Sequence, residues 1–235
     1  MTTKTLYFFS GFDDETGFPP EIAESLREHI TERQALVFIA SDPNDHSTTD
    51  YYAKFGMAQF SKAGIEFTDT HVLDNRKSVD ECVALASNAS VIFLMGGDTL
   101  SQYQFIAKSG LDEVLRQHHG IIAGISAGAI NMAKFALLDE TPKGVPPIVY
   151  RGIGLADITT YPHYSADDKD LLKKILLPFS HKINIYAMED DSAIVIHGDK
   201  TQYIGNIYHI RRGELCHPEV DFGESPVPKG GHQNG

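Results

Sequence analysis

The chain has 235 residues, of which 42% are hydrophobic and 22% are charged, a composition that is ordinary for a folded globular protein and excludes general disorder. Its formal net charge of −12 would repel phosphate backbones and anionic lipids, so we expect neither nucleic acid nor a membrane surface as a partner. Two cysteines are too few for a disulfide framework or a cysteine-rich zinc site, and we expect a reduced, cytoplasmic protein without a secretory leader.

Short apolar runs alternate with amphipathic segments through the first half of the chain. The apolar runs predict buried strands at residues 6–9, 35–40, 65–72, 91–95 and 121–125. The amphipathic segments predict helices at residues 21–33, 48–63, 79–87 and 100–116. Ser78 and Glu81 form a capping box before the third helix, and Gly110 interrupts the fourth. We therefore expect an α/β fold of three layers, in which helices cover both faces of a mostly parallel sheet.

The pattern changes after residue 140, where Pro142, Pro146 and Pro147 mark a loop. Beyond it the sequence predicts a helix at 168–179 and short strands at 158–161, 184–188, 193–196, 202–204 and 207–211. The close spacing of the last four strands predicts an antiparallel meander, so we expect a strand-rich C-terminal part. No linker separates the halves, which favours one domain over residues 1–222. Residues 223–235 are rich in Gly and Pro without an apolar period, which predicts a disordered tail.

The stretch IIAGISAGA carries the strongest chemical signal. Gly124, Ser126 and Gly128 form a G-x-S-x-G pattern between a predicted strand and a helix predicted at 129–135, the context in which this pattern marks a nucleophile elbow. The turn needs a strained backbone at Ser126, and the glycines keep Cβ atoms out of it. The N–H of Ala127 would then stand where it can stabilise an oxyanion. The alternative interpretation is a turn of small residues that only packs the helix against the sheet.

A serine nucleophile requires a base, and the base requires an acid that orients it. His163 is the favoured base because it follows a predicted strand and the rigid Pro162. The alternative is a partly buried histidine with only a structural hydrogen bond. The acid is expected among Glu189, Asp190 and Asp191, in a loop between two predicted strands that can also be an ordinary solvated turn. The order serine, histidine, acid disfavours the α/β-hydrolase fold, in which the acid precedes the histidine.

Four segments carry a wider resemblance. Residues 95–99 read MGGDT, 124–129 read GISAGA, 161–164 read YPHY, and 187–194 hold the acidic loop. In this order and spacing they resemble the motifs of the dipeptidase E and cyanophycinase family of serine peptidases. The resemblance runs from residue 5 to about residue 210, and it implies the class I glutamine amidotransferase-like fold.

The resemblance implies that Ser126 is the nucleophile and that His163 is the general base and acid. The third catalytic member is often glutamate in this family, and the matching position here is Asp190. The alternative positions for this acid are Glu189, Asp191 and Asp139.

The same resemblance places an oxyanion hole at the N–H groups of Gly97 and Ala127. It assigns substrate contacts to Asp98, where the family more often has asparagine, and to Thr99. A capping box from Thr99 to Gln102 gives these two residues an alternative, purely structural role. Neither a metal ion nor another cofactor is implied.

The implied function is hydrolysis of a peptide bond in small peptides through an acyl-enzyme. Members of the family cleave after an N-terminal aspartate or within a polymer of aspartate that carries arginine. Arg151, Arg211 and Arg212 are candidates for binding a substrate carboxylate, although a surface position is the preferred interpretation of them. Two alternatives stay open: an amidase or esterase with the same residues, and a relative without the chemistry that binds a small metabolite. A monomer and a homodimer are both compatible with the sequence.

Overall fold

The computed structural model describes residues 4–13, 15–139 and 146–216, and a seven-stranded sheet forms its centre. The strand order is β11-β10-β1-β5-β4-β2-β3. These strands are β1 (Thr5–Phe9), β2 (Ala35–Ile39), β3 (Asp69–Leu73), β4 (Val91–Leu94), β5 (Ile121–Ile125), β10 (Ala193–His197) and β11 (Lys200–Ile204). The strands from β1 to β5 are parallel, and β10 and β11 extend the sheet in antiparallel pairing. The predicted mostly parallel sheet is confirmed.

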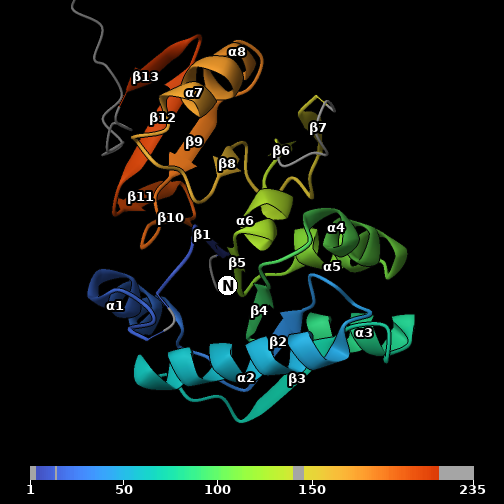
Figure 1. Cartoon of the computed structure of the whole chain (residues 1–235). Helices are drawn as coiled ribbons and strands as arrows, with labels where there is room; N and C mark the ends of the chain where they lie inside the picture. The colour runs from blue at the N-terminus through green and yellow to red at the C-terminus, as the bar shows by residue number, and fades with distance from the viewer. Residues whose placement is uncertain (1–3, 14, 140–145, 217–235) are drawn as a thin grey trace, which may run out of the picture.

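Helices cover both faces of this sheet (Figure 1). Side chains alternate along β1, so Leu6 and Phe8 belong to one buried core whereas Tyr7 and Phe9 belong to the other. The core of Tyr7 and Phe9 is covered by α1 (Pro20–His29) and α2 (His46–Lys62). The opposite core is covered by α3 (Val79–Ser87), α4 (Thr99–Lys108), α5 (Leu111–Gln117) and α6 (Ala127–Met132). The three-layer arrangement expected from the sequence is therefore confirmed.

Several local signals in the sequence correctly predicted features of the helices. Ile22 and Leu26 lie fully buried on the inner face of α1, as their spacing predicted. Ser78 and Glu81 form the predicted capping box at the start of α3. Gly110 has a φ of +67° and separates α4 from α5, because this left-handed conformation suits glycine and ends a helix.

A smaller sheet, in the order β13-β12-β9-β8, lies beside the C-terminal strands of the large one (Figure 1). Its strands are β8 (Thr159–Tyr161), β9 (Ile185–Met188), β12 (Ile207–Arg211) and β13 (Glu214–Cys216). A third core joins this sheet to a helical segment made of α7 (Lys169–Leu171), a π-helical turn (Leu172–Leu176) and α8 (Leu177–Phe179). A separate hairpin consists of β6 (Phe135–Leu138) and β7 (Ile148–Arg151).

The expected antiparallel meander of the C-terminal strands is only partly correct: β10 and β11 form an antiparallel hairpin in the large sheet, but β9 and β12 belong to the small sheet. β9 pairs with β8 in parallel and with β12 antiparallel, whereas β10 lies beside β1 in the large sheet. In β10 the consecutive residues Ala193, Ile194 and Val195 are all buried. Burial on both faces is typical of a strand in the interior of a covered sheet. The loop between β9 and β10 therefore crosses from one sheet to the other, past the end of β1.

Two predicted boundaries are also wrong. The helix predicted at 129–135 ends at Met132 because the next residue is extended, and Phe135 already begins β6. The strand predicted at 65–72 begins only at Asp69, since its first residues connect α2 to β3 without pairing. In both cases the apolar pattern continues beyond the element that it indicates.

The helix predicted at 21–33 also ends early, at His29. Further differences lie in the C-terminal half. The helix predicted at 168–179 is present but contains the π-helical turn, and Asp168 caps its first turn through the N–H of Leu171. The short strands β6, β7 and β13 were not predicted. The tail predicted at 223–235 and the domain end at residue 222 lie outside the described residues.

Candidate active site

Ser126 stands on a sharp turn between β5 and α6, as the G-x-S-x-G pattern predicts. Its φ is 51° and its ψ is −111°, a conformation that side-chain-bearing residues rarely adopt. A Cβ atom on Gly128 would lie 2.2 Å from the carbonyl oxygen of Leu94, and one on Gly124 would lie 2.6 Å from the backbone of Gly128. Both glycines are therefore required for the close contact of strand and helix, and the predicted strained elbow is confirmed.

His163 and Asp190 meet Ser126 at this turn. The Nε2 atom of His163 lies 2.9 Å from Oγ of Ser126, and its Nδ1 atom lies 2.8 Å from Oδ1 of Asp190. A carboxylate can only accept a hydrogen bond, so Nδ1 carries the ring proton and Nε2 is left to accept from the serine hydroxyl. The side chains of His163 and Asp190 are 52% and 58% exposed, so solvent and a small substrate can reach them.

The acidic loop between β9 and β10 directs its carboxylates to different places. Glu189 accepts hydrogen bonds from Nδ2 of Asn206 and from the hydroxyl of Tyr208, at 2.8 and 3.2 Å, instead of binding the histidine. Asp191 has a φ of 62°, and its backbone N–H donates to the carbonyl of Gly11. Asp139 directly follows β6. Among the four acids considered, Asp190 is the one whose contact with His163 the structure records.

Two residues that follow β1 belong to this arrangement although the sequence analysis did not single them out. A Cβ atom on Gly11 would lie 2.6 Å from Oδ1 of Asp190 and 2.7 Å from Cε1 of His163. Ser10 is fully buried, and its Oγ accepts a hydrogen bond from the backbone N–H of His163 at 2.8 Å. The available signal was a serine and a glycine directly after a buried strand, but nothing local indicates what they contact.

The two candidate oxyanion-hole residues lie on either side of the serine turn. Ala127 is the first residue of α6. Gly97 follows β4, the neighbour of β5, and has a φ of +130°, while a Cβ atom on the preceding Gly96 would lie 3.5 Å from Cβ of Ser126. A Cβ atom on Gly97 would lie 2.3 Å from Oγ of Ser41, so glycine is required there for both its conformation and its space.

The expected capping box from Thr99 to Gln102 is wrong, because the N-cap of α4 is Asp98. The carboxylate of Asp98 accepts a hydrogen bond from the N–H of Ser101 at 2.7 Å. Aspartate is among the best N-cap residues, so the helix begins one residue earlier than a threonine cap would allow. Gln102 is fully buried, and its amide donates to the carbonyl of Met95.

The three arginines considered for substrate binding lie elsewhere. Ile207 at the start of β12 pairs with Met188 near the triad, whereas Arg211 lies four residues further along that strand, about 13 Å away. The next residue, Arg212, donates its backbone N–H to the carbonyl of Ser180 at the far end of the small sheet. Arg151 ends β7, opposite Phe135.

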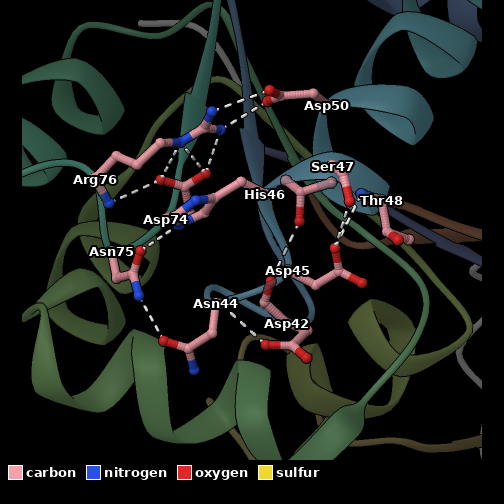
Figure 2. A network of polar contacts seen from close by, with 11 residues as sticks. Asp42, Asn44, Asp45, His46, Ser47, Thr48, Asp50, Asp74, Asn75 and Arg76 are labelled. Atoms are coloured by element: carbon pink, nitrogen blue, oxygen red, sulfur yellow. Dashed lines mark hydrogen bonds and ion pairs between the residues drawn. The ribbon is translucent and has the colours of Figure 1, made fainter.

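A second polar network connects the loops that follow β2 and β3 at the same edge of the large sheet (Figure 2). The guanidinium of Arg76 binds Asp50 at 2.6 Å and also binds Asp74, whose side chain is only 1% exposed. These hydrogen bonds lower the pKa of Asp50 and raise that of Arg76. His46 and Asn75 continue the network at 2.5 Å. Arg76 is thus occupied by carboxylates of its own chain, and it links the loop after β3 to α2, in which Asp50 lies.

Two further kinds of feature are absent from residues 4–13, 15–139 and 146–216. In these ranges no three His, Cys, Asp or Glu side chains are placed to hold a metal ion together. The same ranges contain no helix that is both long and apolar enough to cross a membrane.

A serine on a strained strand-to-helix turn of a mostly parallel sheet, in contact with a histidine and an acid, is typical of serine hydrolases with a nucleophile elbow. The model of peptidase family S51 matches residues 9–204 of this sequence. The chain belongs to this family, the dipeptidase E family, and it is a serine-type peptidase. The resemblance inferred from the four sequence segments is confirmed.

Two solved structures are similar to the chain. A peptidase from an acI-B1 actinobacterium has a TM-score of 0.68 and 18% sequence identity, over 92% of this chain and 97% of that chain. A protein provisionally named peptidase E from Listeria monocytogenes EGD-e has a TM-score of 0.65 and 23% identity, over 86% of this chain and 98% of that chain. At these identities the likeness shows the fold. No curated protein matches the sequence.

Proposed function

We propose that the protein hydrolyses a peptide bond of small peptides through a triad of Ser126, His163 and Asp190. The observation that carries this proposal is the unbroken line of contacts from Oγ of the serine through both ring nitrogens to the carboxylate, at 2.9 and 2.8 Å. A serine is activated when a base lies within hydrogen-bond distance of it and an acid orients that base. These contacts favour a working peptidase over a relative that only binds a metabolite.

The proposed reaction is acyl transfer to water in two stages. His163 accepts the proton of Ser126 at Nε2 as the serine oxygen attacks the peptide carbonyl, and Asp190 stabilises the resulting imidazolium. The N–H groups of Gly97 and Ala127 hold the oxyanion of the tetrahedral intermediate. The imidazolium then gives its proton to the leaving amine, which breaks the peptide bond. A water molecule repeats the attack on the acyl-enzyme and releases the acid.

The proposed substrate class is a small peptide with an N-terminal aspartate. The motifs around Gly97, Ser126 and His163 support it, since they match the dipeptidase E branch, and so does the fold shared with a protein provisionally named peptidase E. Arg211 and Arg212 lie at the far end of the small sheet. Recognition of the aspartate side chain is therefore assigned to hydroxyl and backbone N–H groups near Gly97, among them the hydroxyl of Ser41.

A substrate panel with two variants tests the proposal. The panel compares dipeptides that begin with Asp, Asn or Leu with simple carboxylic esters, and a fluorophosphonate probe reports whether Ser126 is activated. We expect hydrolysis of Asp-X dipeptides and labelling by the wild type, and neither by Ser126→Ala or His163→Ala. Full hydrolysis by Ser126→Ala would overturn the triad. Turnover of esters alone would favour an esterase, and a folded wild type that is neither labelled nor active would favour the binding-only alternative.

A further inference from the structure

Ser10 contacts all three members of the proposed triad. It directly follows β1 and is fully buried. Its carbonyl oxygen accepts the backbone N–H of Ser126 at 3.1 Å, and its Oγ accepts the backbone N–H of His163 at 2.8 Å. The same Oγ lies 3.0 Å from Oδ1 of Asp190. One buried residue thus joins three segments that are far apart in the sequence.

The hydroxyl of Ser10 supports the histidine through its backbone. His163 has a φ of 56°, a left-handed conformation that costs a side-chain-bearing residue free energy and persists only where the surroundings fix it. The N–H group of this residue is directed at Oγ of Ser10, which accepts it. The backbone that aims the imidazole at Ser126 is therefore anchored on Ser10.

The same hydroxyl supports the acid. Its single proton has two acceptors, Oδ1 of Asp190 and the carbonyl oxygen of Met188, each at 3.0 Å. Oδ1 is also the oxygen that faces Nδ1 of His163. The side chain of Asp190 is more than half exposed, and the hydroxyl of Ser10 contacts it from the buried side.

We propose that Ser10 is a positioning residue of the active site. It holds His163 within hydrogen-bond distance of Ser126, and Asp190 within hydrogen-bond distance of His163. This inference rests on the function proposed above. The residue has no exposed surface, so it does not touch substrate and acts through the histidine and the acid. Its removal is therefore expected to impair the chemical step while substrate binding is retained.

Replacement of the hydroxyl separates these effects. For Ser10→Ala we expect kcat to fall about 10- to 100-fold, as for a catalytic group displaced by a fraction of an ångström to 1 Å, with KM unchanged. The rate of fluorophosphonate labelling at Ser126 should fall with kcat. Ser180→Ala is the matched control, because Ser180 is also buried and its Oγ also makes two hydrogen bonds, to Leu177 and Gly213, at the far end of the small sheet. We expect full activity for this control, and unchanged kcat in folded Ser10→Ala would overturn the inference.

A double-mutant cycle with Asp190→Ala distinguishes positioning from general loss of structure. If Ser10 acts through both residues, Ser10→Ala costs less activity when Asp190 is already absent, because only its support of His163 then remains to be lost. An equal loss in both backgrounds would overturn the inference. Should Ser10→Ala not fold, Ser10→Cys replaces it, since a thiol of similar shape is a weak donor and acceptor, and an intermediate kcat is expected. Hydrolysis by Ser126→Ala would instead refute the proposed function, whatever the result at Ser10.

Discussion

At the scale of single residues, the site depends on unusual backbone conformations. Four non-glycine residues of the described part have a positive φ, and three of them, Ser126, His163 and Asp191, lie at or beside the proposed triad. Each costs about 1–3 kcal/mol and persists only when its surroundings hold it. The carbonyl groups of Phe9 and Ser10 hold the N–H of Ser126, and the carbonyl of Gly11 holds that of Asp191. The residues that end β1 and follow it therefore maintain the strain.

The space left by Gly11 leads to the first prediction. The Cβ atom introduced by Gly11→Ala would overlap Asp190 and His163, so we expect kcat/KM to fall about 100-fold through displacement of these groups. Gly64→Ala is the control: Gly64 has a φ of +75° and open space around its Cβ position, so this variant bears backbone strain without touching the site. Steady-state kinetics on the same peptide compare the two. Full activity of Gly11→Ala would show that the triad tolerates the extra atom.

The identity of the acid leads to the second prediction. Asp190→Asn should lower kcat by about 10²- to 10⁴-fold, because an amide at this position no longer holds the required tautomer of His163. Glu189→Gln should leave kcat within about twofold, since the carboxylate of Glu189 binds Asn206 and Tyr208 instead. Kinetics of both variants with one dipeptide decide between them. If Glu189→Gln lowered kcat more than Asp190→Asn, Glu189 would be the third member of the triad.

At the scale of elements, loops at the C-terminal edge of the large sheet are fixed by contacts between neighbouring loops. The loop after β2 is joined to the loop after β3 by Asn44 with Asn75 (Figure 2). The start of α2 is joined to the loop after β3 by His46 with Asn75 and by Asp50 with Arg76. The first of these loops also presents Ser41 to Gly97. The network thus supports the wall of the site on the side away from the histidine.

Removal of the central cation of this network gives the third prediction. Arg76→Ala leaves the carboxylate of Asp74, which is 1% exposed, with only the backbone N–H of residue 76, so the free energy of unfolding should fall by about 1–3 kcal/mol. Arg76→Lys should recover only part, because an ammonium group cannot bind two carboxylates in the bidentate manner. Lys174→Ala, which removes an exposed pair with Asp170, is the control and should change little. Urea denaturation measures all three, and an unchanged midpoint for Arg76→Ala would contradict the assigned role.

Elements with a local signal could be predicted from the sequence, whereas their pairing could not. The parallel strands, the Gly110 break and the capping box of Ser78 depend on neighbours within a few residues. The separation of β9 from β10 depends on which sheet buries each strand, and the N-cap of α4 depends on competition between Asp98 and Thr99. Such competition is resolved by tertiary contacts, so the sequence pattern predicted the wrong result in both places.

At the scale of the whole molecule, the proposed triad lies where the two sheets meet. Ser126 belongs to the large sheet, His163 follows β8 of the small sheet, and Asp190 lies on the loop that crosses between them. Ser126 and His163 could be predicted because each has its own motif. Ser10 and Gly11 could not, since their roles arise only when three segments, each more than 100 residues distant from β1, fold against its end. Assembly of the site therefore requires the described fold as a whole.

The pH dependence of the folded state gives the fourth prediction. Burial lowers the pKa of His118 to about 4, and the nearby charges of Lys4 and His119 act in the same direction. The unfolded chain, where the pKa is near 6.5, thus binds more protons than the folded chain between pH 6.5 and pH 4. The free energy of unfolding should therefore fall as pH decreases through this window, by up to about 3 kcal/mol from this group. In His118→Gln the decrease should be smaller by this amount, whereas His119→Gln, which removes only the smallest of the three causes, should change the profile little. Urea denaturation at pH 7, 6, 5 and 4 measures the three profiles, and identical slopes for wild type and His118→Gln would contradict a buried neutral imidazole.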